Sequence, residues 1–181
     1  MRFANDPDSF GLISKLLHWL TATAMVGLIW LGWYMVDLTY FDRWYNASLA
    51  FHKAFGVLVF LLGVTTLLWR LISASPAFVG TLKPWQRIAA RAMHHALLLL
   101  VILIPFSGYI ISTSAGKSVS FFGWFEIAPL FEVSGTLRDL AIEAHFYLAY
   151  TVGVLVVAHA AAALKHQFVD RDGTLARMLW R

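Results

Sequence analysis

The sequence predicts an all-α integral membrane protein, a four-helix bundle with both termini in the cytoplasm. Hydrophobic residues make up 60% of the 181 residues and charged residues only 13%. The mean hydropathy is +0.69, which lies outside the range of soluble globular domains. The charged residues are unevenly spread, and the segments between the uncharged stretches are short. A chain with this composition and patterning belongs in a lipid bilayer.

Four stretches of the chain contain no Asp, Glu, Lys or Arg: 16–36, 54–69, 92–116 and 144–164. A helix needs about 20 apolar residues to cross the hydrocarbon core, and three of these stretches have 21, 25 and 21 residues. The second has only 16, but Lys53 and Arg70 bracket it and can extend their charged ends to the interfaces. We therefore expect a single membrane domain over 1–181. Its four spans are expected at about 14–38, 47–72, 86–113 and 138–168.

The basic residues predict the orientation of the bundle. Four spans place the N-terminus, the loop between the second and third spans and the C-terminus on one side. That side carries ten basic residues: Arg2, Lys15, Arg70, Lys83, Arg87, Arg91, Lys165, Arg171, Arg177 and Arg181. The other side carries four: Arg43, Lys53, Lys117 and Arg138. The positive-inside rule therefore places both termini in the cytoplasm.

The N-terminal residues and the absence of cysteine narrow the chemistry. The first residues lack the basic region, short apolar run and cleavage site of a signal peptide, so we expect the first span to remain in the mature protein. Without cysteine the chain cannot form disulfides, thiolate-bound clusters or the covalent attachment of a c-type haem. A bound metal or haem must therefore use other ligands.

Histidines occur within the expected spans at two depths. Ionisable side chains are costly inside a membrane and usually mark a functional interior. In the fourth span, His145 and His159 are 14 residues apart, so they lie within roughly 40° of one helix face and about 21 Å apart along the axis. His52 matches His145 near the outer end of the second span, and His18 matches the inner depth of His159. The sequence thus predicts an outer pair and an inner pair.

Paired histidines in a helical bundle are suited to a haem iron. Two facing imidazoles can fill both axial positions, which favours electron transfer over oxygen binding. Zinc and copper also accept imidazole, but two ligands are too few without carboxylates or thiolates at the same depth, and the spans offer none. Buried histidines bonded to backbone carbonyls would explain one or two of these residues, but not the pairing. We predict two haem b groups with four metal ligands: His18, His52, His145 and His159.

Small and basic residues near these histidines fit the shape and charge of a haem. Gly56 lies one turn after His52, and Gly153 lies between the two histidines of the fourth span. Both leave room beside a ligand helix, although small residues are common wherever membrane helices approach closely. Haem propionates need cationic partners near the interfaces, for which Arg43 and Lys53 are placed at the outer end and Arg70 or Arg91 at the inner end. The ordinary role of such residues is snorkelling and topology.

Three further histidines lie outside the two pairs. His94 and His95 begin the third span and point about 100° apart, so at most one of them faces the inner haem closely. That residue bonds a propionate or a quinone headgroup, or else it faces the lipid headgroups. We expect His166, beyond the last apolar turn, to be an interfacial residue. Pro105 lies inside the third span, where we expect it to kink the helix.

With these residues the chain resembles the bacterial cytochrome b561 family of dihaem, four-helix membrane proteins, over nearly its whole length. The motifs that carry the resemblance are Ser-Lys-Leu-Leu-His18-Trp-Leu, His52 followed by Gly56, Arg70 after Leu-Leu-Trp, Pro105 with Gly108, His145, and His159-Ala-Ala-Ala-Ala-Leu-Lys-His166. As a set these motifs are specific. The resemblance implies the same four axial ligands, and none of the ligand positions is missing.

The resemblance also implies electron exchange between the haems and ubiquinone. One relative in the family resembles a superoxide oxidase that passes the electron of superoxide to quinone. This chain departs from that relative in its outer loops and tail, at Tyr40–Tyr45, Ser112–Lys117, Phe122–Phe125 and Asp170–Met178. These segments are similar to another branch, often encoded beside a periplasmic lipocalin-like protein that binds isoprenoid quinone. We expect quinone, such a lipid-binding protein and membrane lipids as partners, and no nucleic acid.

The expected function is electron transfer between a quinone and a partner at the periplasmic face of the bacterial inner membrane. One alternative is a superoxide oxidase, which would need a cationic outer funnel where only four basic residues are expected. The others are a haem-free assembly or transport subunit and the membrane-anchor cytochrome of a dehydrogenase or hydrogenase. A visible absorption spectrum and co-purification separate these alternatives.

The outer loop expected at 114–137 is too long for a simple helix connection. It carries four aromatic residues close together: Phe121, Phe122, Trp124 and Phe125. Such a cluster sits at the level of the lipid headgroups. Lys117 and Arg138 flank it, so the loop can offer an apolar floor and cationic groups to a quinone headgroup or an acidic partner. The alternative is a plain interfacial anchor.

Overall fold

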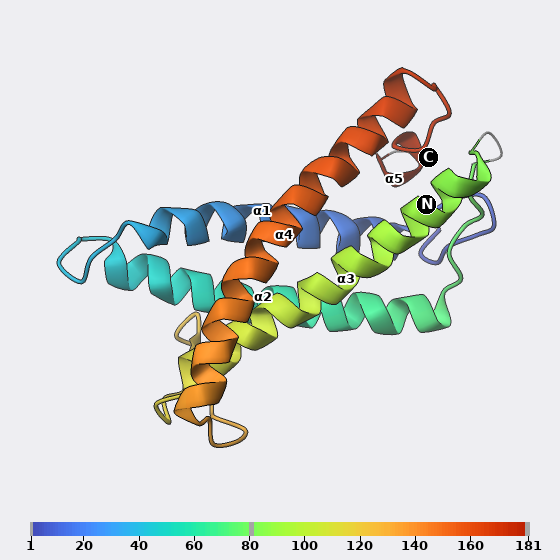
Figure 1. The fold of residues 1–181 in the computed structure, drawn as a ribbon. Coiled ribbons are helices and arrows are strands. Elements are labelled where there is room, and N and C mark those ends of the chain that lie inside the picture. The colour runs from blue at the N-terminus through green and yellow to red at the C-terminus, as the bar shows by residue number, and fades with distance from the viewer. Residues whose placement is uncertain (1, 80–81, 180–181) are drawn as a thin grey trace.

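The computed structural model describes residues 2–79 and 82–179, and four long helices dominate these residues (Figure 1). They are α1 (Leu12–Val36), α2 (Tyr45–Ile72), α3 (Pro84–Thr113) and α4 (Gly135–Phe168). Each is long and apolar enough to cross a bilayer, which confirms the predicted four-helix membrane fold. The described residues also form the short elements β1 (Val119–Phe121), β2 (Phe125–Ile127) and α5 (Ala176–Leu179).

The long helices pack as two antiparallel hairpins. The first hairpin is α1 with α2, the second is α3 with α4, and the contact between α2 and α3 joins them. In Figure 1 the second hairpin crosses the first at a steep angle. The centre is held by a cluster of buried apolar side chains: Met25, Leu28, Val59, Leu100, Val101, Ile104 and Val152. On α4 the cluster residue Val152 falls between the outer His145 and the inner His159.

Much of the remaining apolar surface faces outward. Large side chains such as Trp30, Leu71 and Val154 are at least two-thirds exposed. An apolar surface of this extent would drive association or aggregation in water. In a bilayer it is the surface that the lipid tails cover.

Local signals start two of the helices. Pro84 occupies the first position of α3, where its missing N–H costs nothing, and the Lys83 N–H donates to Gln86 Oε1 at 2.8 Å. The Ser134 side chain caps α4 by accepting the N–H of Leu137 at 3.2 Å. The helix α3 continues through Pro105 to Thr113.

The aromatic outer loop contains a β-hairpin, which the sequence analysis did not predict. Strands β1 and β2 pair antiparallel, with Phe121 opposite Phe125. Phe122 and Gly123 in the turn have φ values of 52° and 77°, a left-handed conformation that Gly123 adopts without strain. The Phe122 ring contacts Phe55 of α2 with 5.1 Å between ring centres. Since Phe55 is three residues after His52, the hairpin covers the outer end of α2.

The opposite end of the bundle gathers both ends of the chain (Figure 1). The Trp19 indole N–H donates to the Met178 carbonyl at 2.9 Å. The Arg177 guanidinium donates to the carbonyls of Asp8 and Ala77, at 3.0 Å and 2.9 Å. The tail after α4 is therefore bonded to the N-terminal segment, to α1 and to the connection between α2 and α3.

Candidate functional site

The outer histidine pair joins α2 to α4. The ring centres of His52 and His145 lie 6.2 Å apart, with the ring planes inclined by 67°. Gly32 of α1 lies against the first ring and Gly108 of α3 against the second. A Cβ atom at either glycine would come within 3.2 Å of the Cε1 atom of the histidine that it faces. Glycine at both positions therefore lets the neighbouring helices approach these rings closely.

A backbone carbonyl orients the ring of His145. Its Nδ1 lies 3.0 Å from the Ile104 carbonyl oxygen and 3.0 Å from Ser107 Oγ. The Ser107 hydroxyl donates to the same Ile104 oxygen at 2.7 Å. When the Nδ1–H of His145 donates to this carbonyl, Nε2 keeps its lone pair and is the nitrogen that can bind a metal. The residues around Pro105 thus help to position a candidate ligand.

The inner pair joins α1 to α4, and a third histidine lies beside it. The ring centres of His18 and His159 are 6.3 Å apart, with planes inclined by 64°. The ring of His94, on α3, is 5.4 Å from that of His159. His94 and His95 are both exposed, but the Nδ1 of His95 lies 2.8 Å from the Arg91 carbonyl of its own helix. Of the two adjacent histidines, the structure brings only His94 to the inner pair.

The spacing within each pair matches two imidazoles on opposite sides of one metal ion. A metal–imidazole bond is about 2.0 Å and the ring centre lies about 1.2 Å beyond the nitrogen, so the ring centres would be about 6.4 Å apart. A direct hydrogen bond between two imidazoles would bring their centres to about 5.3 Å. The observed 6.2 Å and 6.3 Å agree with the first arrangement and exceed the second. The residues therefore fit a haem iron between the rings of each pair.

Open space and positive charge lie near the pairs. A Cβ atom at Gly27, Gly56 or Gly153 would meet no other atom within 4 Å. These positions leave open space beside the helices. Arg70, in the last turn of α2, interacts electrostatically with His18 and His94. The positive charge therefore lies at the inner pair.

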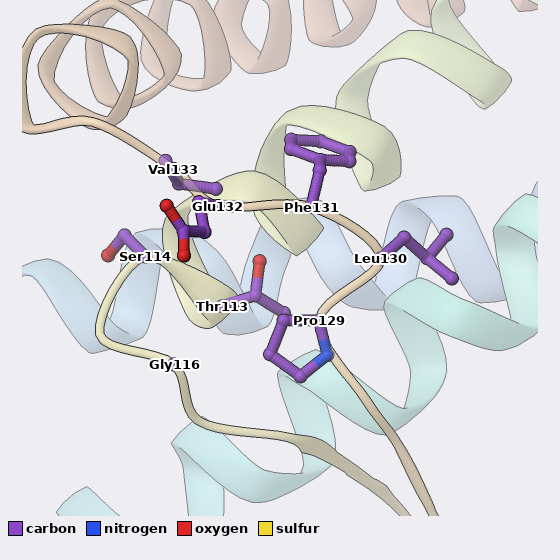
Figure 2. A pocket seen from close by; sticks show the side chains of 8 residues that line it. All are labelled: Thr113, Ser114, Gly116, Pro129, Leu130, Phe131, Glu132 and Val133. Carbon is purple, nitrogen blue, oxygen red and sulfur yellow. The ribbon is translucent and has the colours of Figure 1, made fainter.

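A hollow of about 420 Å³ opens beside the outer loop (Figure 2). It lies between the end of α3 and the segment before α4, and its lining residues are Thr113, Ser114, Gly116, Pro129, Leu130, Phe131, Glu132 and Val133. Figure 2 shows the side chains of these lining residues. Its lining includes Glu132 but neither Lys117 nor Arg138. Among the described residues, this hollow therefore lacks the cationic side chains expected beside a site for a quinone headgroup or an acidic partner.

Three features of the described residues were not predicted from the sequence. Two are the contacts of Gly32 and Ser107 with the outer histidines, although glycine and serine within an apolar span are signals of close packing and of a polar contact. The third is the pairing of His166, which was expected only to be interfacial but whose Nδ1 lies 2.7 Å from Asp170 Oδ2 and 3.2 Å from Asp172 Oδ2. The signal was the two aspartates four and six residues further on, which a helix that ends in a tight turn brings back to the histidine.

Four apolar helices that carry facing histidine pairs define a membrane-spanning b-type cytochrome. The chain belongs to the prokaryotic cytochrome b561 family, whose sequence profile matches residues 9–181. It is 45% identical over 179 residues to cytochrome b561 homolog 2 of Escherichia coli K12, covering 99% of this chain and 95% of the relative. It is also 30% identical to cytochrome b561 homolog 1 of the same organism, over 96% of this chain and 98% of the relative.

A further relative carries an enzymatic description. The chain is 30% identical over 166 residues to the probable superoxide oxidase of Yersinia pestis, covering 90% of this chain and 91% of that protein. Family membership and the four apolar helices make this chain a multi-pass protein of the bacterial inner membrane. Its cofactor is b-type haem and its activity is electron transfer.

Proposed function

We propose that the chain binds two b haems, an outer one between His52 and His145 and an inner one between His18 and His159. The observation that carries this proposal is the spacing of the rings, 6.2 Å and 6.3 Å between centres. Each bound haem supplies a one-electron Fe(III)/Fe(II) couple. Held by two histidines, each haem would serve electron transfer rather than the binding of oxygen.

The protein positions the two cofactors and sets their surroundings. The helix α4 provides one ligand to each haem, so it spaces the two sites. The Ile104 carbonyl holds His145 in the tautomer that leaves Nε2 available. Gly56 provides room beside His52, and Arg70 provides a positive charge for a propionate at the inner haem.

The charges predict how the protein sits in the membrane and what approaches it. The side with both termini carries ten basic residues and four acidic ones, Asp6, Asp8, Asp170 and Asp172. We propose that this side is cytoplasmic. The other side carries four basic residues against six acidic ones: Asp37, Asp42, Glu126, Glu132, Asp139 and Glu143. The proposed periplasmic side therefore has a formal charge of −2.

A negative outer face favours a neutral quinone over superoxide as the electron-exchange partner. The superoxide anion is attracted by a positive funnel, and Arg138 is already paired with Asp139 at 3.6 Å. We propose that quinone, delivered from lipid or by a periplasmic lipid-binding protein, exchanges electrons with the outer haem beneath the hairpin. Exposed apolar side chains support this location: Trp124 is 79% exposed and Leu130 is 79% exposed. Superoxide oxidation is the second candidate, and the relative from Yersinia pestis favours it.

Stopped-flow spectroscopy of the purified protein tests this proposal. The haem absorption band would be followed after mixing with ubiquinol, with oxidised quinone and with superoxide, and haem would be counted per chain. We expect two haems and rapid exchange with quinone. One haem per chain would overturn the dihaem assignment, and fast reduction by superoxide with slow quinol exchange would favour the second candidate.

Two variants and a reporter locate the exchange site. Replacing Trp124 and Phe125 together with Ala should slow quinone-dependent oxidation of the haem while the haem content stays intact. Replacing the exposed Trp33 of α1 with Ala is the matched control, because it removes an exposed aromatic side chain outside the loop. A reporter fused within 114–137 should read periplasmic. A cytoplasmic reading would reverse the proposed orientation, and unchanged kinetics would leave the hairpin as an interfacial anchor.

A further inference from the structure

Three metal-ligating side chains meet where α4 ends and the tail turns back. His166 lies in the last turn of α4, and Asp170 and Asp172 follow it. His166 Nδ1 is 2.7 Å from Asp170 Oδ2 and 3.2 Å from Asp172 Oδ2, and the three ligand atoms all lie within 4.8 Å of one another. We call these three residues the tail cluster. The haem proposal uses none of them.

The carboxylate of Asp172 is buried and incompletely bonded. Its side chain is only 1% exposed. One oxygen, Oδ1, accepts the Thr174 N–H at 2.9 Å. The other, Oδ2, accepts no hydrogen bond within residues 2–79 and 82–179. Its nearest polar atom is His166 Nδ1 at 3.2 Å, and the two form an ion pair only when the imidazole is protonated. A buried carboxylate oxygen without a partner is costly, so a cation between these atoms would offset that cost.

The turn of the backbone holds the cluster together. The Asp170 N–H donates to the Lys165 carbonyl at 3.1 Å, and the Asp172 N–H donates to the His166 carbonyl at 3.2 Å. Arg171 between them has a φ of 54°, an uncommon conformation for a residue with a Cβ atom. This conformation places both aspartates on the same side of the turn, facing the histidine.

We propose that the tail cluster binds a divalent transition-metal ion, Zn²⁺ in the first place, through His166, Asp170 and Asp172, with water as the fourth ligand. Zn²⁺ accepts imidazole nitrogen and carboxylate oxygen at about 2.0–2.2 Å, so tetrahedral ligands are about 3.3 Å apart. The separation of 3.2 Å between His166 Nδ1 and Asp172 Oδ2 is close to this value. The separation of 2.7 Å from Asp170 Oδ2 is shorter, so the more exposed Asp170 side chain would move back slightly to admit the ion. Mg²⁺ and Ca²⁺ prefer sites made of oxygen alone, and the histidine favours Zn²⁺ over them.

Lys165 competes for one of the ligands. Its ammonium lies 2.9 Å from Asp170 Oδ1 and 2.7 Å from Oδ2. Both oxygens of this carboxylate are therefore within hydrogen-bonding distance of the ammonium. The Lys165 side chain is 51% exposed, and an exposed ion pair of this kind is worth little. The metal ion can therefore displace Lys165 from Asp170.

Metal binding at this place would fix the tail on the bundle. Two contacts follow the cluster: the Ala176 N–H donates to Gln167 Oε1 at 3.3 Å, and the Met178 carbonyl accepts the indole N–H of Trp19. Trp19 is the neighbour of His18 in α1. A bound ion would thus stabilise the turn from which the tail reaches the inner end of α1.

Equilibrium dialysis of the haem-loaded protein against Zn²⁺ tests the site, after a chelator wash and with zinc measured by atomic emission. Haem loading keeps the paired histidines occupied. We expect one Zn²⁺ per chain, with Asp172→Asn and Asp170→Asn each weakening binding by about tenfold or more. Lys165→Gln should tighten binding, because it removes the competing ammonium. Asp8→Asn is the matched control, since it removes a carboxylate at the same end outside the cluster, and it should bind as the wild type does.

The haem spectrum of each variant reports whether the protein has folded. Zn²⁺ should also slow the cleavage of the tail by trypsin at Arg171 in the wild type but not in Asp172→Asn. Absence of saturable Zn²⁺ binding would overturn the proposal and leave the cluster as an ion pair between His166 and its aspartates. Equal binding by the wild type and both aspartate variants would also overturn it. These outcomes do not depend on the electron-transfer assays.

Discussion

The two histidine pairs share α4 but have different surroundings. The outer pair lies between two glycines, each so close that a Cβ atom would come within 3.2 Å of a ring, and the Ile104 carbonyl orients His145. The inner pair has a third ring, His94, within 5.4 Å of His159, and the charge of Arg70 nearby. Steric fit therefore dominates the outer site and electrostatics the inner site. Substitutions that change side-chain volume should act mainly on the outer site, and substitutions that change side-chain charge should act mainly on the inner site.

The largest expected effect is the loss of one haem from one site. His145→Ala should remove the outer haem and His159→Ala the inner one, because each leaves the iron with a single protein ligand. The pyridine haemochrome assay should give about one haem per chain in each variant, and redox titration should show which potential is lost. If His159→Ala keeps both haems with unchanged spectra, the assignment of the inner pair is wrong.

Smaller losses should follow from added volume at the outer site. Gly32→Ala and Gly108→Ala each place a methyl group against a histidine ring, so the ring must move away from its position (about 0.5 to 1.5 kcal/mol for a strained rotamer). We expect partial loss of the outer haem and an unchanged inner haem, measured by haem content. Gly135→Ala is the control, because its Cβ atom would meet nothing within 4 Å. Equal losses at both sites would contradict the steric account of the outer pair.

A change of charge should act on the potential of the inner haem. Oxidised haem carries one more positive charge than reduced haem, so a nearby cation favours the reduced form. Arg70→Gln should therefore lower the reduction potential of the inner haem by on the order of tens of millivolts. It should lower the reduction potential of the outer haem less. Arg2→Gln serves as control, because Arg2 lies at the same end of the bundle, pairs with Asp6 and has a side chain that is 81% exposed. Redox titration would measure both, and an unchanged inner potential would argue against the role of Arg70.

The smallest effect should come from Ser107→Ala. This change removes one polar contact of His145 Nδ1 but keeps the Ile104 carbonyl at 3.0 Å. We expect the affinity for the outer haem to fall by less than tenfold, below the 10- to 100-fold range that is typical when the group orienting a ligand is lost entirely. Titration of the haem-depleted protein with haem would measure the change. A larger loss would mean that Ser107, and not the carbonyl, orients the ring.

Much of the fold could be predicted because a bilayer imposes simple rules. Charge-free stretches identify spans, and the 14-residue spacing in α4 places its two histidines at separate depths. Period and rise were therefore enough to anticipate which rings meet. The place of His94 was left open, since a sequence does not say how α3 is rotated about its axis, and this rotation decides whether His94 or His95 faces inward.

Other features depend on contacts between distant residues. The closeness of Gly32 to His52 is set by the packing of α1 on α2, which no local pattern encodes. The β-hairpin escaped prediction because its strands have three residues each, too few for an alternating pattern to show. The tail cluster depends on the left-handed conformation of Arg171. Arginine has no preference for this conformation, so the sequence does not predict it.

The sharing of α4 by both pairs has a consequence for how the chain can change in length. The other two histidines, His18 and His52, come from separate helices. The turn that joins α1 to α2 can therefore become longer or shorter without displacing either of them. Between His145 and His159 no such freedom exists. One inserted residue would rotate one ligand by about 100° relative to the other and shift it by about 1.5 Å. The segment of α4 between the two histidines therefore fixes their relative position. An insertion there would turn one of them away from its partner histidine, whereas the loops tolerate insertions of the same length.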